Sequence, residues 1–129
     1  MHHGLDSALL ADVEAFCEEV RPSEELAYLE HRFNDEAVAL ARKHDLLGMT
    51  VPVQFGGRGT DLRSYLQAHV LIGREGTGLR TLFSAHSSIG QTPIIEWGNN
   101  DQKNRYLTAS ARGEKIMAFA LSAPDAGSN

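Results

Sequence analysis

Hydrophobic residues recur three and four positions apart along the first two-thirds of the chain, which is the spacing of one face of an α-helix. The first apolar stripe consists of Leu9, Leu10, Val13, Phe16, Cys17 and Val20. Asp6 or Ser7 is suited to cap its start. Pro22 is expected to end this helix because the residue before a proline avoids helical backbone, and a short second helix is expected from Ser23 toward His31.

Polar residues mark the starts of the next two helices. A third helix is expected from about Asn34 to Leu46, with Gly48 as its stop. A loop rich in glycine follows at 49–59, and Asp61 then caps a fourth helix. The residues of the fourth helix expected to face inward are Leu62, Tyr65, Leu66, His69, Val70 and Ile72.

Two more helices complete the helical part. The fifth has the stripe Leu79, Leu82, Phe83, His86, Ile89, Pro93, Ile94 and Trp97. Pro93 is expected to kink or divide it. Small residues flank this stripe and suit either close packing or a slender ligand, and packing alone explains them. Asn100 is expected to cap the sixth helix, and Gly113 to close it.

The pattern changes from helix to strand near the C-terminal end. Residues 115–121 are apolar at both odd and even positions, which predicts a strand buried on both faces. A lone strand cannot pair with itself, so it must join a sheet from other sequence or another chain. The fold class is therefore predicted to be all-α, with a C-terminal strand that enters a missing β domain.

Composition narrows the functional classes. The 129 residues suit one domain, and the net charge of −5 without a Lys/Arg run disfavours nucleic-acid binding. No apolar run approaches the roughly 20 residues that cross a bilayer, and no secretory signal opens the chain. Cys17 is the only cysteine, which excludes an intrachain disulfide, and it is expected to fill the core. The expected location is the cytoplasm, or the mitochondrial matrix in a eukaryote.

Two motifs have structural interpretations. Gly56-Gly57-Arg58-Gly59 lacks the Lys-Ser/Thr pair of a phosphate-binding loop and is interpreted as a turn. His69 and His86 lie on apolar helix faces without the ligand spacing of a metal site. Both are interpreted as hydrogen-bonded core histidines, although His86 could instead approach a cavity.

The last residues have a different character. The apolar run 115–121 ends in a hydroxyl at Ser122, turns at Pro124 and finishes on the small pair Gly127-Ser128. Such a segment offers backbone N–H groups and hydroxyls with little side-chain bulk, which suits an anionic or electron-rich cofactor.

Three blocks of sequence together resemble the acyl-CoA dehydrogenase family. They are Leu46-Leu47-Gly48-Met49 leading to Phe55-Gly56-Gly57-Arg58-Gly59, then Pro93-Ile94-Ile95-Glu96-Trp97-Gly98-Asn99, then Ala118-Phe119-Ala120-Leu121-Ser122 with Pro124-Asp125-Ala126-Gly127-Ser128. The resemblance implies an N-terminal helical domain at 1–114 and, at 115–129, the first strand and flavin-contact loop of an incomplete middle β domain.

The resemblance also implies a function. Members of the family use FAD to oxidise acyl thioesters to the 2,3-enoyl form, and usually pass the electrons to an electron-transferring flavoprotein. The substrate would be carried on coenzyme A or on an acyl-carrier protein, and the enzyme would be a homo-tetramer or homo-dimer. The catalytic carboxylate of the family lies in a C-terminal helical bundle, so no catalytic residue is assigned in this chain.

The site residues follow from the same resemblance. Those expected to contact FAD are Phe119, Leu121, Ser122, Gly127 and Ser128. Those expected to line the acyl pocket are Ser128, Leu82, Phe83 and Ile89. Ser122 replaces the usual threonine and keeps the hydroxyl, whereas Val53, Ala123 and Asn129 replace common acidic residues. These departures weaken the case for ordinary fatty-acid β-oxidation and leave a specialised biosynthetic role open.

Two other functions remain compatible with the sequence. A flavin-dependent monooxygenase can be built on the same scaffold, and the residues that would distinguish it lie outside these 129. A helical module for binding or assembly, without chemistry of its own, becomes the better interpretation if the natural chain ends at Asn129.

Overall fold

The computed structural model describes residues 4–127, and within them the chain is helical and has no β-strand. This confirms the all-α prediction. The α-helices are α1 (Ser7–Leu29), α2 (Asp35–Lys43), α3 (Leu62–Glu75), α4 (Thr77–Ser84), α5 (Thr92–Trp97), α6 (Asn100–Gln102) and α7 (Thr108–Ala111). The remaining elements are a 3₁₀ turn, η1 (Val53–Phe55), and two π-helical segments, η2 (Ala85–Gln91) and η3 (Lys103–Leu107).

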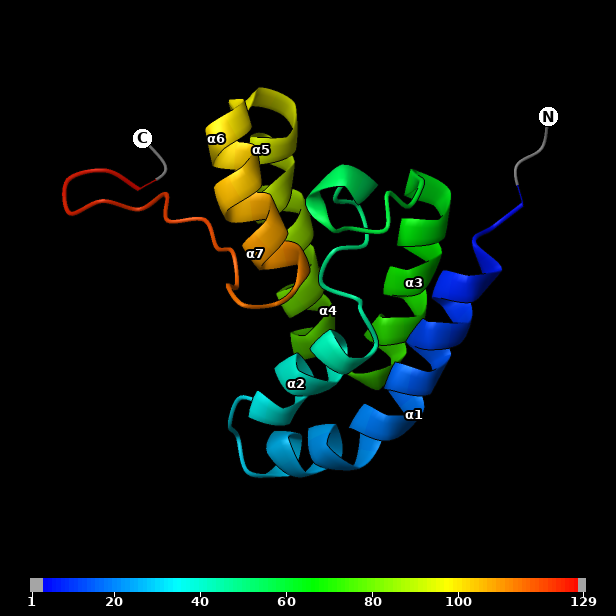
Figure 1. Cartoon of the computed structure of the whole chain (residues 1–129). Helices are drawn as coiled ribbons and strands as arrows, with labels where there is room; N and C mark the ends of the chain where they lie inside the picture. The colour runs from blue at the N-terminus through cyan, green and yellow to red at the C-terminus, as the bar shows by residue number, and fades with distance from the viewer. Residues whose placement is uncertain (1–3, 128–129) are drawn as a thin grey trace.

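The helices pack as two groups (Figure 1), with one main core and a smaller second cluster of Val51, Leu107 and Ala111. Helix α1 lies against α2 and α3, whereas α4, η2 and α5 form one unbroken rod beside a second rod of α6, η3 and α7. The main core consists of Leu9, Val13, Phe16, Cys17, Val20, Ala37, Leu40, Ala41, Leu46, Leu47, Met49, Tyr65, Ala68, Ile72, Leu79 and Phe83.

Burial raises the pKa of the Cys17 thiol to about 11, so this cysteine stays protonated and fills space, as predicted.

The predicted break at Pro22 is wrong, because α1 continues through it to Leu29. Figure 1 shows the helix bending in its second half. The Ser23 hydroxyl donates to the Val20 carbonyl at 3.0 Å, within the turn that the proline disturbs. Val20 and Ala27 are buried on either side of the bend, so packing offsets the roughly 3 kcal/mol that a proline costs inside a helix.

Helix α2 begins where predicted but ends earlier. Asn34 holds the N-cap position, yet its side-chain amide donates to Ser23 and Glu24 of α1 instead of capping its own helix. The helix ends at Lys43 because Asp45 adopts the left-handed conformation (φ 54°), which stops the chain before it reaches Gly48.

Asp61 caps α3 as predicted, by accepting from the backbone N–H groups of Arg63 and Ser64. The predicted inward face is only partly correct. Tyr65 and Ile72 are buried together with the small residues Ser64 and Ala68. Three predicted inward residues are exposed instead: Leu62, Leu66 and Val70. The helix packs against α1, and Ser64 accepts from the Asp6 N–H at 2.9 Å on that side.

The rod of residues 77–97 contains a π-helical segment that the sequence did not reveal. The backbone N–H of Thr92 donates to the Ser87 carbonyl, five residues back, so the backbone widens just before Pro93. Pro93 then occupies the first turn of α5, where its missing N–H does little harm.

In the next rod the N-cap is Asn99 and not Asn100 as predicted. Gly113 closes that rod with φ 70°, as predicted.

Residues 115–127 leave the helices as extended chain along the second rod (Figure 1). The predicted burial of both faces is absent here, since Ile116, Phe119 and Leu121 are all exposed. We call residues 118–127 the C-terminal segment. Its one described pairing is a turn in which Ala123 and Ala126 exchange backbone hydrogen bonds.

Candidate functional site

The predicted cofactor residues lie together on the C-terminal segment and face solvent. Phe119 is 59% exposed and Leu121 is 67% exposed, while Ser122 and Gly127 are exposed as well. Ser128 lies outside the described residues. The backbone N–H groups of residues 118–122 donate to no other described residue, so the segment offers a row of free donors. A Cβ placed on Gly127 would meet no atom within 4 Å, which leaves its backbone open to close approach.

The start of this segment is fixed to the helices by one buried histidine. The Met117 N–H donates to His86 Nδ1 at 2.9 Å, and His86 on η2 is only 1% exposed. The opposite ring nitrogen, Nε2, lies 3.0 Å from the Leu47 carbonyl and 3.2 Å from the Ser110 carbonyl. The Met117 N–H can only donate and the two carbonyls can only accept, so Nδ1 is the acceptor and Nε2 carries the proton, although the Gln91 amide nitrogen also lies 3.0 Å from Nε2.

Gln91 and Ser110 complete the polar network around His86. The Gln91 amide nitrogen donates to the Leu47 carbonyl at 2.9 Å and to Ser110 Oγ at 3.0 Å. Ser110 Oγ in turn donates to the Leu107 carbonyl at 3.0 Å. Among the described residues Gln91 Oε1 has no partner, although the residue is fully buried. The network ties η2, the loop after α2 and the second rod together directly beneath Met117.

Gly90 makes room for the chain at the same place. A Cβ on Gly90 would collide with the Cβ of Met117. Since His86 and Gly90 are four residues apart on η2, one helix surface supplies both the acceptor and the space. We call His86, Gly90 and Met117 the Met117 anchor. Sequence reasoning missed this role, because the contact joins residues 31 positions apart.

Burial lowers the pKa of His86, opposed by the hydrogen bonds to Leu47 and Ser110. The side chain is therefore neutral near neutral pH, which is the state that accepts from Met117. Its interpretation as a hydrogen-bonded core histidine is confirmed. For His69 the predicted hydrogen bond is absent at Nε2, which is buried without a partner among the described residues. The His69 ring instead packs edge-on against the Tyr65 ring, with the two ring centroids 4.3 Å apart.

The residues predicted to line an acyl pocket do not share one environment. Leu82 is half-buried and Ile89 is 49% exposed, so both reach the surface of the long rod. Phe83 is buried in the core, where its ring packs edge-on against the Phe16 ring with the two ring centroids 5.4 Å apart. Phe83 therefore supports the rod from within, whereas Leu82 and Ile89 offer apolar surface.

The glycine-rich turn at 56–59 is structural, as interpreted. Gly56 adopts φ 84°, and a Cβ on Gly57 would collide with the Val51 carbonyl, so the loop folds back on itself.

Within residues 4–127 no group of His, Cys, Asp and Glu is arranged to hold a metal ion. The described helices also include none with the length and hydropathy needed to span a membrane.

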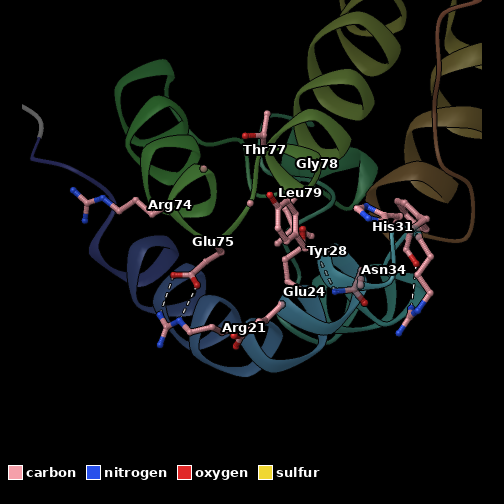
Figure 2. A pocket seen from close by; sticks show the side chains of 16 residues that line it. Arg21, Glu24, Tyr28, His31, Asn34, Arg74, Glu75, Thr77, Gly78 and Leu79 are labelled. Atoms are coloured by element: carbon pink, nitrogen blue, oxygen red, sulfur yellow. Dashed lines mark hydrogen bonds and ion pairs between the residues drawn. The ribbon is translucent and has the colours of Figure 1, made fainter.

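A surface groove of about 870 Å³ lies elsewhere, between the second half of α1 and the junction of α3 with α4. Figure 2 shows that some of its polar side chains pair with one another, whereas Arg74 points away. Arg21 makes a two-pronged ion pair with Glu75 (2.8 and 2.9 Å), and Glu24 accepts from Asn34 at 3.0 Å. None of the predicted site residues lines this groove.

Comparisons with known proteins agree on one family. Residues 6–114 match the family model described as acyl-CoA dehydrogenase, N-terminal domain. An acyl-CoA dehydrogenase of Bacillus subtilis (strain 168) is 36% identical over 111 residues, covering 86% of this chain and 29% of that protein. A 3-(aryl)acrylate reductase of Clostridium sporogenes (strain ATCC 15579) is 32% identical over 97 residues, covering 75% of this chain and 26% of that protein.

The fold also matches solved structures. The crystal structure of an acyl-CoA dehydrogenase complexed with FAD from Bacillus anthracis superposes with a TM-score of 0.78 at 36% identity, covering 93% of this chain and 21% of that one. The chain thus spans less than a third of the length of each of these three proteins.

Proposed function

The chain belongs to the acyl-CoA dehydrogenase family, and from this membership we propose that it is the helical domain of an FAD-dependent enzyme that dehydrogenates an acyl thioester. One observation supports this most directly. The C-terminal segment presents Phe119, Leu121 and Ser122 outward on free backbone, anchored at Met117. In this proposal residues 1–114 are the helical domain and residues 115–129 begin a β domain.

The described residues suit the chemistry of a flavin. When bound, FAD would accept the β hydrogen of the substrate as a hydride. The N–H groups of Leu121 and Ser122, with the Ser122 hydroxyl, would donate to the electron-rich edge of the ring. The Phe119 ring would cover apolar flavin surface. Gly127 would let the backbone approach the pyrophosphate, with Ser128 donating there or to the thioester chain.

The long rod would form one wall of the acyl pocket. Leu82 and Ile89 supply exposed apolar surface for the acyl chain, and Phe83 holds the rod in place from the core. In the proposal the carboxylate that removes the α proton comes from sequence beyond these 129 residues. The thioester would be an acyl-CoA or an acyl-carrier-protein conjugate, and an electron-transferring flavoprotein would accept the electrons. We further propose a homo-tetramer or homo-dimer in the cytoplasm or mitochondrial matrix.

The test is a stopped-flow experiment on the longest natural polypeptide that carries residues 1–129. After loading with FAD, an acyl-CoA series is mixed anaerobically and the visible flavin absorbance is followed. We expect bleaching without nicotinamide and formation of enoyl product. Reduction only by an external reductant, followed by a peroxide adduct with oxygen, would establish a monooxygenase instead. A folded protein that binds no FAD would establish a binding or assembly module.

A further inference from the structure

We propose that His86 is a positioning residue: through the Met117 anchor it fixes where the C-terminal segment leaves the helices, and so where its donors meet the cofactor. The part of this inference that concerns FAD rests on the proposed function. The anchor itself is independent of that function.

The geometry leaves little freedom at this point. Met117 is half-buried between an exposed Ile116 and an exposed Ala118. It is therefore the last residue that the helices hold before the C-terminal segment begins. Its N–H is fixed by His86 Nδ1, and Gly90 sets how closely its Cβ can approach η2. Phe119 follows two residues later, at most about 7 Å further along an extended chain. A shift at Met117 is therefore passed on directly to the row of donors at 119–122.

The ring of His86 has only one orientation that serves this purpose. Its Nε2–H is held by the Leu47 and Ser110 carbonyls, which come from two different parts of the chain. Turning the ring over would replace the Nδ1 acceptor with the Cδ2–H group, and moving the proton to Nδ1 would place an N–H against the Met117 N–H. The two carbonyls therefore favour the tautomer with the proton on Nε2, and in that tautomer Nδ1 can accept from the Met117 N–H.

Two substitutions separate positioning from simple core filling. His86→Asn keeps an oxygen acceptor close to the position of Nδ1 but loses the group at Nε2. His86→Gln places an amide N–H close to Nε2, where it can still donate to Leu47 and Ser110, but loses the acceptor at Nδ1. If His86 only fills the core, Gln replaces it at least as well as Asn. If His86 positions the segment, Asn is the better replacement.

The first readout is amide hydrogen exchange of the 129-residue chain, measured at Met117. We expect His86→Gln to speed exchange at Met117 roughly tenfold or more, and His86→Asn to stay within about threefold of the unchanged chain. Equal exchange in the Gln variant and the unchanged chain would overturn the proposal. So would faster exchange in the Asn variant than in the Gln variant.

The second readout is FAD affinity in the longest natural polypeptide that carries this chain. Here the substitution removes the N–H of Met117 and changes no residue of the helices. We expect Met117→Pro to weaken FAD binding roughly tenfold relative to Met117→Ala, because only proline lacks the N–H. Ile116→Pro is the matched control, since the Ile116 N–H has no described partner and lies outside the row of donors, and this variant should bind more tightly than Met117→Pro.

The two proposals fail in different ways. If the unchanged polypeptide binds no FAD, the proposed function fails and the exchange experiment still decides the anchor. If it binds FAD and Met117→Pro binds equally well, the enzyme assignment stands and the positioning role of His86 is overturned.

Discussion

Individual polar residues in this core differ in whether burial leaves them with a partner. His86 has hydrogen bonds at both ring nitrogens, whereas Nε2 of His69 has none among the described residues. Tyr65 finds its partner in Ser87: the hydroxyls lie 2.7 Å apart, and Ser87 in turn donates to the Phe83 carbonyl. The inward positions of His86 and Tyr65 were predicted correctly, whereas Leu62, Leu66 and Val70 were expected inward and are exposed. The partners could not be predicted, because each lies on a different element.

The two histidines make stability depend on pH. Burial lowers the pKa of both His69 and His86, and nearby Arg80 lowers that of His69 further. Their contribution is complete above the unfolded pKa of about 6.5 and is lost as pH falls from there toward the folded values, since the unfolded state then binds more protons. Urea unfolding between about pH 7.5 and 5 should show stability falling with acidity.

The histidine variants test this assignment. His86→Asn should reduce the slope of stability against pH because one titrating group is removed, and His69→Phe should do the same. An unchanged slope in both variants would contradict the assignment and place the titration elsewhere in the chain.

At the scale of elements, the sequence predicted where helices begin better than where they end. Asp6 and Asp61 cap the helices expected of them, because a cap is a contact within a few residues. The continuation through Pro22 and the π-helical segment at 85–91 depend on packing between distant residues. These features are outside the reach of local propensity.

The start of α6 gives a test within a single turn. Asn99 accepts from the Gln102 N–H at 2.8 Å, and the Gln102 side chain accepts from the Asn99 N–H at 2.9 Å, which forms a reciprocal cap. We expect Asn99→Ala to lower the free energy of unfolding by about 1 kcal/mol. Asn100→Ala is the matched control and should be neutral or slightly stabilising, since alanine favours a helix interior. Chemical denaturation measures both, and a larger loss from Asn100→Ala would place the cap one residue later.

At the scale of the whole molecule, the helical domain and its extended end have different sources of order. The fold and the candidate cofactor segment were predicted, the first from hydrophobic spacing and the second from resemblance to a family. The Met117 anchor was not, because His86, Gln91 and Ser110 meet only after the two rods have packed. The domain therefore builds a fixed starting point for a segment that it does not itself cover.

Truncation separates these two sources of order. A chain ending at Ala118 keeps the Met117 anchor, and the described residues that it loses, 119–127, are all exposed, so its free energy of unfolding should stay within about 0.5 kcal/mol of the full chain. A chain ending at Lys115 removes Met117 and leaves His86 Nδ1 buried without a donor, which should cost roughly 1–3 kcal/mol. Urea unfolding followed by circular dichroism compares the three chains. A loss of roughly 1–3 kcal/mol already in the chain ending at Ala118 would show that residues 119–127 contribute to the core. A chain ending at Lys115 that is no less stable than the one ending at Ala118 would show that the Met117 anchor adds nothing to stability.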